Sequence, residues 1–338
     1  MKVDIDIDRI VYNSKSYGDI TLLADLGGRR ATGRLHSGID VADLDADFDA
    51  TLGDSAWSWD VDGDIRHLDL MALGLSKEAN AGTMTLATTG VYNPLTRAVD
   101  GRISVDRLTW LTGTTTLRAD STVADVALDA AGIRARVAQG DLLAVASTQC
   151  PLESIMPRID ATMLLVDRLV KAKKINIDSL QRALPPMSLS LEAGRNNIVS
   201  EYLAGADSRG PQFRQLALTA STDSLINIVG KVTGFSTGST RLDTIRLTAV
   251  QHGGFLVYNA QVSNAPGTMD NFARVTLNGY LGENRLTPAP EQYKRGERLQ
   301  NRSGSDDDRF GGNPAARALQ PHDSLQAVGG ERQQLCQL

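Results

Sequence analysis

The sequence predicts a mainly β protein, folded as a long antiparallel meander with a short helical insert. Two observations lead to this prediction. Over most of the chain, apolar and polar residues alternate with the period of two that is typical of strands. The chain also contains 31 glycines but only 5% aromatic residues, which favours many strands joined by tight turns. About 240 strand residues, at about 12 residues per strand and turn, give about 20 strands and a sheet on the order of 100 Å long.

Strand character is clearest from Thr244 to Leu286, where three amphipathic segments follow one another. Gly253-Gly254 and the stretch from Asn264 to Gly267 suit the turns between these segments. Each segment keeps its apolar residues on one face, so the stretch predicts a sheet with one apolar side. The apolar positions of the last two segments are Leu256, Tyr258 and Val262, followed by Val275, Leu277 and Leu281.

Residues 1–148 are predicted to form an N-terminal β-meander. Their clearest strand runs from Val41 to Leu52, where aspartate alternates with apolar residues. Because like charges two positions apart in a strand lie only about 7 Å from each other, the aspartate face is expected to be in water. Downstream, Asp60 to Asp64 lacks the ligand pattern of a calcium loop and is expected to be a solvated hairpin turn. The apolar positions of the clearest strand include Ala42, Leu44, Phe48 and Leu52.

Residues 149–206 have a different pattern and are predicted to be a helical insert that contains one strand. Apolar residues from Ile159 to Val170 recur at steps of three and four, which is a helical period. A second short helix is expected to end at Pro185-Pro186, because proline lacks the amide that would continue it. Strand character returns in residues 207–287, the predicted C-terminal β-meander.

The last region, residues 288–338, loses the apolar alternation and is rich in Arg, Gln, Asp, Gly and Pro. This composition predicts a disordered tail. We hypothesise that a shift of reading frame produced the change, because the codons allowed for Gly296 to Cys336 also permit, one base later, a sequence with strand character. The sequence of the parent locus would test this hypothesis.

Charge and motif content exclude several classes of function. A net charge of -5 and a pI near 5.5 leave no basic surface for nucleic acid. The four histidines lie far apart without the spacing of metal ligands, and no motif indicates a cofactor or a catalytic group. The chain is therefore predicted not to be an enzyme. Trp57 and Trp59 could stack on sugars, but they share one strand face, where cross-strand packing accounts for them at least as well.

Three stretches carry a resemblance to a known family. They are the helical segment from Pro151 to Leu184, LPPMSLSLEAGRNNIVSEYL at Leu184 to Leu203, and VYNAQVSNAPGTMDNFARVTLNGYL at Val257 to Leu281. With the preceding meander, they resemble the TamB-like translocation and assembly family, a branch of the AsmA-like proteins of diderm bacteria. The resemblance lies in the pattern of strand-like and helix-like segments rather than in catalytic motifs. The family's inner-membrane anchor and conserved C-terminal module have no counterpart here, so the chain is expected to be an internal fragment without an anchor or signal of its own.

The resemblance implies a long, curved β-sheet with an apolar inner groove, tethered in the inner membrane and spanning the periplasm. It also implies a role in outer-membrane biogenesis, through the assembly of outer-membrane proteins, phospholipid transport between the two membranes, or both. The implied partners are an Omp85-type outer-membrane barrel protein and phospholipid acyl chains. Contact with the membrane would be made by parts of the parent protein that this chain lacks.

A passive mechanism follows from an apolar groove. An acyl chain would lie along it with its head group in water, which avoids exposing the chain at about 0.8 kcal/mol per CH₂. An extracellular β-rich structural protein or adhesin is the alternative, and a carbohydrate-active β-sandwich is a third. The same residues would also suit an ordinary sandwich core. The candidate groove-lining residues are Ala42, Leu44, Phe48, Leu52, Leu256, Tyr258, Val262, Val275, Leu277 and Leu281.

Overall fold

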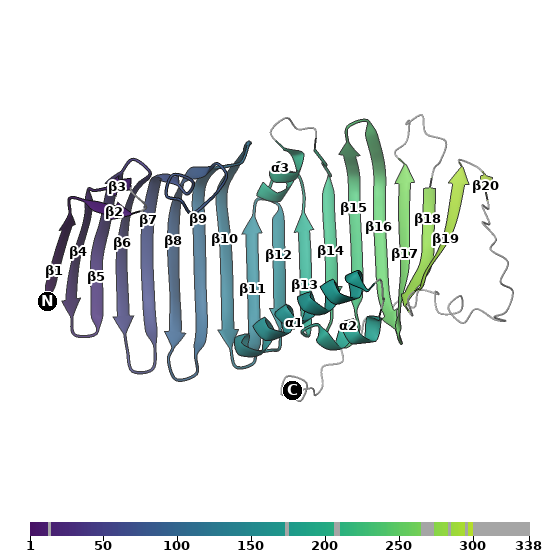
Figure 1. Cartoon of the computed structure of the whole chain (residues 1–338), viewed down its shortest axis with the longest axis horizontal. Coiled ribbons are helices and arrows are strands. Elements are labelled where there is room, and N and C mark those ends of the chain that lie inside the picture. Colours follow the sequence, from purple (N-terminus) through teal and green to yellow (C-terminus); the bar gives the residue numbers. More distant parts are fainter. Residues whose placement is uncertain are drawn as a thin grey trace.

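In the computed structural model, one antiparallel sheet dominates the protein (Figure 1). The structure describes residues 1–12, 15–172, 176–205, 210–264, 274–282, 285–294 and 297–299. Eighteen strands form the sheet, each paired antiparallel with the strands next to it in sequence, except that β1 pairs with β4. Strands β2 (Ile10–Tyr12) and β3 (Lys15–Tyr17) form a separate hairpin. The prediction of a mainly β, antiparallel fold with a short helical insert is confirmed.

The strands of the sheet follow the chain from one end to the other. The first half contains β1 (Lys2–Ile7), β4 (Ile20–Gly27), β5 (Arg30–Ile39), β6 (Ala42–Leu52), β7 (Trp57–Asp69), β8 (Asn80–Asn93), β9 (Ala98–Thr112), β10 (Thr115–Asp129), β11 (Gly132–Gln139) and β12 (Leu142–Thr148). The second half contains β13 (Met187–Ala193), β14 (Gln215–Ser221), β15 (Asn227–Thr237), β16 (Thr240–His252), β17 (Phe255–Asn264), β18 (Arg274–Gly282), β19 (Arg285–Lys294) and β20 (Glu297–Leu299).

Tight turns join these strands, as the glycine content predicts. Gly28, between β4 and β5, and Gly253, between β16 and β17, both have φ of +59°, the left-handed conformation that two-residue hairpin turns require. The turn expected at Gly253-Gly254 is therefore confirmed. The other turn expected in this part of the chain, from Asn264 to Gly267, falls almost entirely on residues 265–273, which lie outside the described residues.

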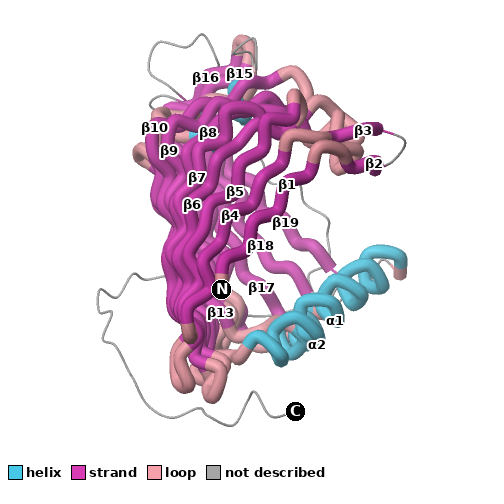
Figure 2. Tube along the Cα trace, turned by 90° about the vertical axis from the view of Figure 1, so that its left-hand side faces the viewer, coloured by secondary structure: helices cyan, strands magenta, loops and turns pink. Residues whose placement is uncertain are grey.

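The sheet bends along its strands and has a C-shaped profile (Figure 2). Irregular pairing near the upper ends of the strands in Figure 1 accompanies the bend. Such bulges bend a strand and increase its local twist, which is how curvature enters a sheet. These bulges form a row across the sheet. Arg107 lies in this row of bulges and has a φ of +54°, which few residues other than glycine adopt. The register shifts fall between Asp43 and Leu44, Ile65 and Leu68, Thr83 and Thr85, and Leu242 and Thr244.

Helices α1 (Leu152–Lys171) and α2 (Ile177–Ala183) connect β12 to β13 and cross in front of the lower ends of the middle strands (Figure 1). Thr162 Oγ1 donates a hydrogen bond of 2.8 Å to the Ala183 carbonyl and so joins the two helices. Asn176 caps α2 by accepting from the Ser179 amide at 2.8 Å. Gln181 Nε2 donates to the Ser224 carbonyl at 3.1 Å, which ties α2 to the sheet.

Helix α3 (Ile198–Ala204) lies at the upper ends of the middle strands (Figure 1). Asn197 caps it by accepting from the Ser200 amide at 2.9 Å. Gln139 Oε1 accepts from the Ile198 amide at 2.7 Å, and Asp141 accepts from Asn197 Nδ2 at 2.6 Å. Beneath this helix lies a small buried cluster of Leu142, Ala193 and Phe213, packed against Leu191, Val199, Leu216 and Val232.

Two expectations about local structure are wrong. Asp60 to Asp64 is not a turn but the middle of β7, because its backbone pairs in register with β6 on one side and with β8 on the other. The chain also does not lose strand structure at Pro288, since β19 continues to Lys294 on the edge of β18 and β20 follows it. Among the described residues, β20 pairs with β19 only from Gln292 onwards, so Pro288 and Pro290 pair with β18 alone, and at such an edge proline is tolerated. The rest of the predicted tail, residues 300–338, lies outside the described residues.

The predicted regions meet in one sheet. Residues 1–148 contain β1 to β12, and 149–206 contain the three helices and β13. Residues 207–287 contain β14 to β18, and β13 joins the two meanders by pairing with β12 and β14. Among the described residues, no helix has both the length and the apolar character that crossing a membrane requires.

Candidate functional site: the uncharged concave face

The strand pairings place all ten candidate lining residues on one face of the sheet. Residues opposite each other in antiparallel strands share a face, and the face alternates along each strand. The register can therefore be followed without a break from Leu44 in β6 to Leu277 in β18. The two predicted sets, one from each meander, lie on the same side although more than 200 residues separate them.

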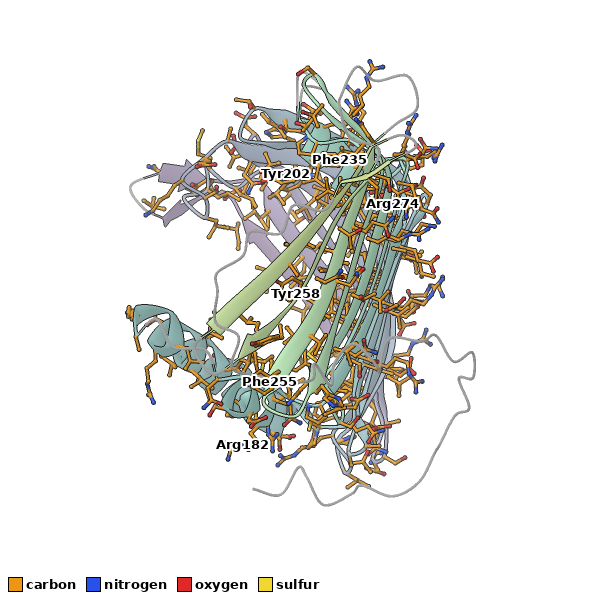
Figure 3. The ribbon with its side chains drawn as sticks, turned by 90° about the vertical axis from the view of Figure 1, so that its right-hand side faces the viewer. Arg182, Tyr202, Phe235, Phe255, Tyr258 and Arg274 are labelled. Atoms are coloured by element: carbon orange, nitrogen blue, oxygen red, sulfur yellow. The ribbon has the colours of Figure 1, made fainter. Side chains whose placement is uncertain are left out.

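This shared face is the concave one. Tyr258 lies opposite Gly279, whereas Arg274, five positions from Gly279, belongs to the other face. Figure 3 shows Tyr258 on the inner side of the curved sheet and Arg274 on its outer side. Helix α3 packs on the same inner side, since Leu142 and Leu191 beneath it lie on the face of Tyr258.

Within the described residues, no second layer of structure covers the concave face. None of the ten candidate residues is buried, and Leu52 is 53% exposed. All ten residues of β17 are of intermediate burial, whereas the inner face of a sandwich would be sealed. The alternative that these residues form an ordinary sandwich core is therefore wrong for the described part of the chain. The three helices cover only the upper and lower margins of the middle strands (Figure 1).

No charged residue interrupts this face between the lower turns and the row of bulges. In β1 and β4 to β18, every concave position of the paired, described segments carries an apolar residue, Gly, Ser, Thr, Asn or Gln. Two of the amides, Gln139 and Gln251, are buried and used within the protein. Gln139 holds α3, and Gln251 Oε1 accepts from the Ile226 amide at 3.1 Å. Between the margins that the helices cover, the face therefore presents uncharged and largely apolar surface from β1 to β18.

Aromatic rings on the concave face lie over glycines of the neighbouring strand. A Cβ atom added to Gly90 would come within 2.1 Å of the Trp59 ring, and one added to Gly33 within 2.5 Å of the Phe48 ring. Trp59 Nε1 donates to Thr88 Oγ1 at 3.2 Å, which satisfies the indole without leaving the sheet. These two rings therefore lie against the backbone of the neighbouring strand.

One row across the concave face consists mostly of small residues. It crosses β4 to β18 at a single height, so it runs along the length of the sheet, and nine of its fifteen positions are alanine or glycine. At these nine positions little side-chain volume stands on the concave face. In order, the row is Leu26, Ala31, Ala50, Trp59, Gly90, Gly101, Val126, Ala135, Ala146, Leu189, Ala220, Ile228, Ala249, Tyr258 and Gly279.

Sequence reasoning missed these two features because each depends on register. Nothing local to Gly33 or Gly90 indicates that an aromatic ring of the neighbouring strand lies over it. A possible signal is the position of the glycines inside alternating segments, which typically marks a close approach. By contrast, Trp57 and Trp59 do share a face, as expected, and Trp57 packs edge-on against Tyr92 with ring centroids 5.4 Å apart.

The convex face carries the charges, and the aspartates of β6 are neutralised there as well as exposed to water. Arg34 Nε donates to Asp47 at 2.8 Å, and this hydrogen bond holds the pKa of Asp47 below its usual value. Arg30 lowers the pKa of Asp49 in the same way. Hydrogen bonds from Arg66, and then from His36, lower the pKa of Asp45. The basic residues Arg30, Arg34 and His36 alternate along β5 as the aspartates alternate along β6. This complementary pattern could have been predicted from the sequence.

Neither potential metal ligands nor comparisons with other proteins assign a function to the described residues. In the part of the chain that the structure describes, no group of three or more His, Cys, Asp or Glu side chains is placed to hold a metal ion. No protein-family model matches the chain, and neither the curated proteins nor the solved structures contain a significant match.

Proposed function

We propose that this chain is the apolar groove of a protein that carries phospholipid acyl chains along an extended β-sheet. One observation supports the proposal above all: an uncharged concave face that no second layer covers in the part of the chain that the structure describes. The sixteen strands β1 and β4 to β18, at about 4.8 Å spacing, make this face on the order of 70 Å long. Exposed apolar patches of this extent are typical of binding surfaces rather than of a finished monomer surface.

The physical basis of the proposed binding is the transfer of the acyl chain out of water. Each methylene that lies against the concave face contributes about 0.8 kcal/mol. The head group would remain in water, because the face offers no charged residue to pair with it. Such a groove needs no catalytic residue, and movement along it costs little because the small-residue row continues from strand to strand.

Together with the resemblance described above, the groove supports a more specific proposal. The parent protein would be a TamB-like, inner-membrane-anchored protein of the periplasm, acting in outer-membrane biogenesis with an Omp85-type barrel partner. It would transport phospholipid between the two membranes, assist the assembly of outer-membrane proteins, or both. An anchor-encoding segment upstream and a barrel-protein gene alongside would support this assignment.

The three tryptophans offer a direct test, because Trp57, Trp59 and Trp110 all occupy concave positions. Fatty acid brominated on its acyl chain should quench their fluorescence, since bromine quenches indole on contact, whereas the unbrominated fatty acid should not. For a single-site comparison, one variant keeps only Trp59. A matched variant has all three tryptophans replaced by phenylalanine and carries Val91→Trp, which places one indole on the convex face of the neighbouring strand.

The expected result is saturable quenching of Trp59 and little quenching at position 91. Equal quenching at the two positions, or none at either, would contradict the groove. Circular dichroism of both variants confirms that the sheet is retained.

A further inference from the structure

The charges of the chain are distributed unequally along the sheet. Residues 1–148 contain 14 Lys and Arg against 22 Asp and Glu, whereas residues 207–287 contain 7 against 5. The difference is sharper on the convex face. In β14 to β18, no paired convex position carries an acidic residue, while Lys231, Arg246 and Arg274 all lie there. The convex face is therefore acidic in its first half and basic towards β18.

The basic end contains a like-charge pair that the fold does not need. Lys231 and Arg246 lie directly opposite each other in β15 and β16, an arrangement that destabilises a sheet. Both are exposed, as is Arg274. None of the three has an acidic partner among the described residues, in contrast to Arg30, Arg34 and Arg66 in the first half. What sets these three cations apart is that no acidic residue occupies a paired convex position of β14 to β18, so their charge is left to meet a negative charge from outside.

Exposed apolar and aromatic side chains accompany these cations on the same convex face. Val229 is 42% exposed, Val250 is 43% exposed and Tyr280 is 37% exposed. Tyr280 packs edge-on against Phe255, with centroids 5.5 Å apart. Cations mixed with aliphatic and aromatic side chains are typical of surfaces that contact lipid head groups, whereas a contact with a soluble acidic partner would not require the exposed valines.

We infer that the convex face of β15 to β18 docks onto an anionic lipid bilayer surface, with the acidic first half of the sheet turned away from it. Attraction at one end and repulsion at the other would orient the sheet relative to the bilayer. This contact lies on the face opposite the proposed groove and does not depend on whether the groove is occupied.

The test is flotation of the full chain with vesicles of phosphatidylcholine, with and without phosphatidylglycerol, at low and high salt. The informative variant combines Lys231→Glu, Arg246→Glu and Arg274→Glu. A matched control variant combines Lys2→Glu, Arg118→Glu and Arg134→Glu, which change the net charge by the same amount. These three cations are exposed on the convex face of the first half and have no ion pair among the described residues.

We expect the wild type and the control variant to float only with phosphatidylglycerol and only at low salt. The variant at β15 to β18 should bind about 100-fold more weakly, because each cation near an anionic surface contributes about fivefold. Equal binding by the two variants, binding that ignores phosphatidylglycerol, or salt-sensitive self-association without flotation would overturn the inference. Bromine quenching of Trp59 in the same variants reports on the groove separately, so failure of one proposal can be told from failure of the other.

Discussion

A single charge introduced into the concave face should abolish groove binding locally, whereas the same charge on the convex face should not. Val126 in β10 is a concave residue and 38% exposed, and Val91 in β8 is a convex residue and 45% exposed. Val126→Lys and Val91→Lys therefore form a matched pair. Both remove a half-exposed valine from a strand, so each should cost about 1 kcal/mol of folding stability.

The two variants should differ in acyl-chain binding. A hydrated lysine at Val126 keeps the acyl chain away from at least one strand spacing, about 4.8 Å, or about four methylenes. At about 0.8 kcal/mol each, the loss is about 3 kcal/mol, which corresponds to roughly 100-fold in affinity. Titration of Trp59 fluorescence with brominated fatty acid measures this affinity. If Val126→Lys binds as tightly as Val91→Lys while both melt at the same temperature, the concave face is not the binding surface.

Two further predictions concern the stability of the sheet. Gly90→Ala should lower the free energy of unfolding by about 1–3 kcal/mol, because the new Cβ would lie 2.1 Å from the Trp59 ring, whereas Gly63→Ala, with its nearest atom at 3.6 Å, should be neutral in denaturant unfolding. The lowered pKa of Asp47 contributes stability that is present above the unfolded pKa of about 3.9 and is lost as pH falls through the folded pKa. Arg34→Gln should therefore lower Tm at neutral pH but converge on the wild type in strong acid, and a gap that persists in acid would show that the Asp47–Arg34 pair is not its cause.

The strands and their apolar faces were predictable because alternation is a local property. The pattern from Val41 to Leu52 alone assigns a strand and both of its faces, and the structure agrees. The pattern from Leu256 to Leu281 does the same in the other meander. The two apolar sets share one face only if every hairpin between them keeps the apolar residues of successive strands on the same side of the sheet. The strand register shows that each hairpin does so.

The errors have a common origin in pairing, which local patterns do not report. Composition predicted disorder from Pro288, yet the open edge of β18 supplies backbone partners as far as Tyr293. Glycine and aspartate suggested a turn at Asp60 to Asp64, yet both neighbouring strands pair along that segment. In each case an existing strand edge outweighs weak intrinsic preference, as is usual for β structure.

The two faces of the sheet are also consistent with the direction in which it bends. When strands curve, side chains at positions i and i+2 approach each other on the concave side and separate on the convex side. The concave side therefore favours small residues and flat rings, as in the row that contains Gly90 and Ala135, with Trp59 over Gly90. The convex side relieves the repulsion between successive aspartates such as Asp45 and Asp47, which face Asp64 and Asp62 across the strand pair. Bending in the opposite direction would crowd like charges and splay the apolar residues into water, so the same alternation that defines each strand also selects the side on which the groove forms.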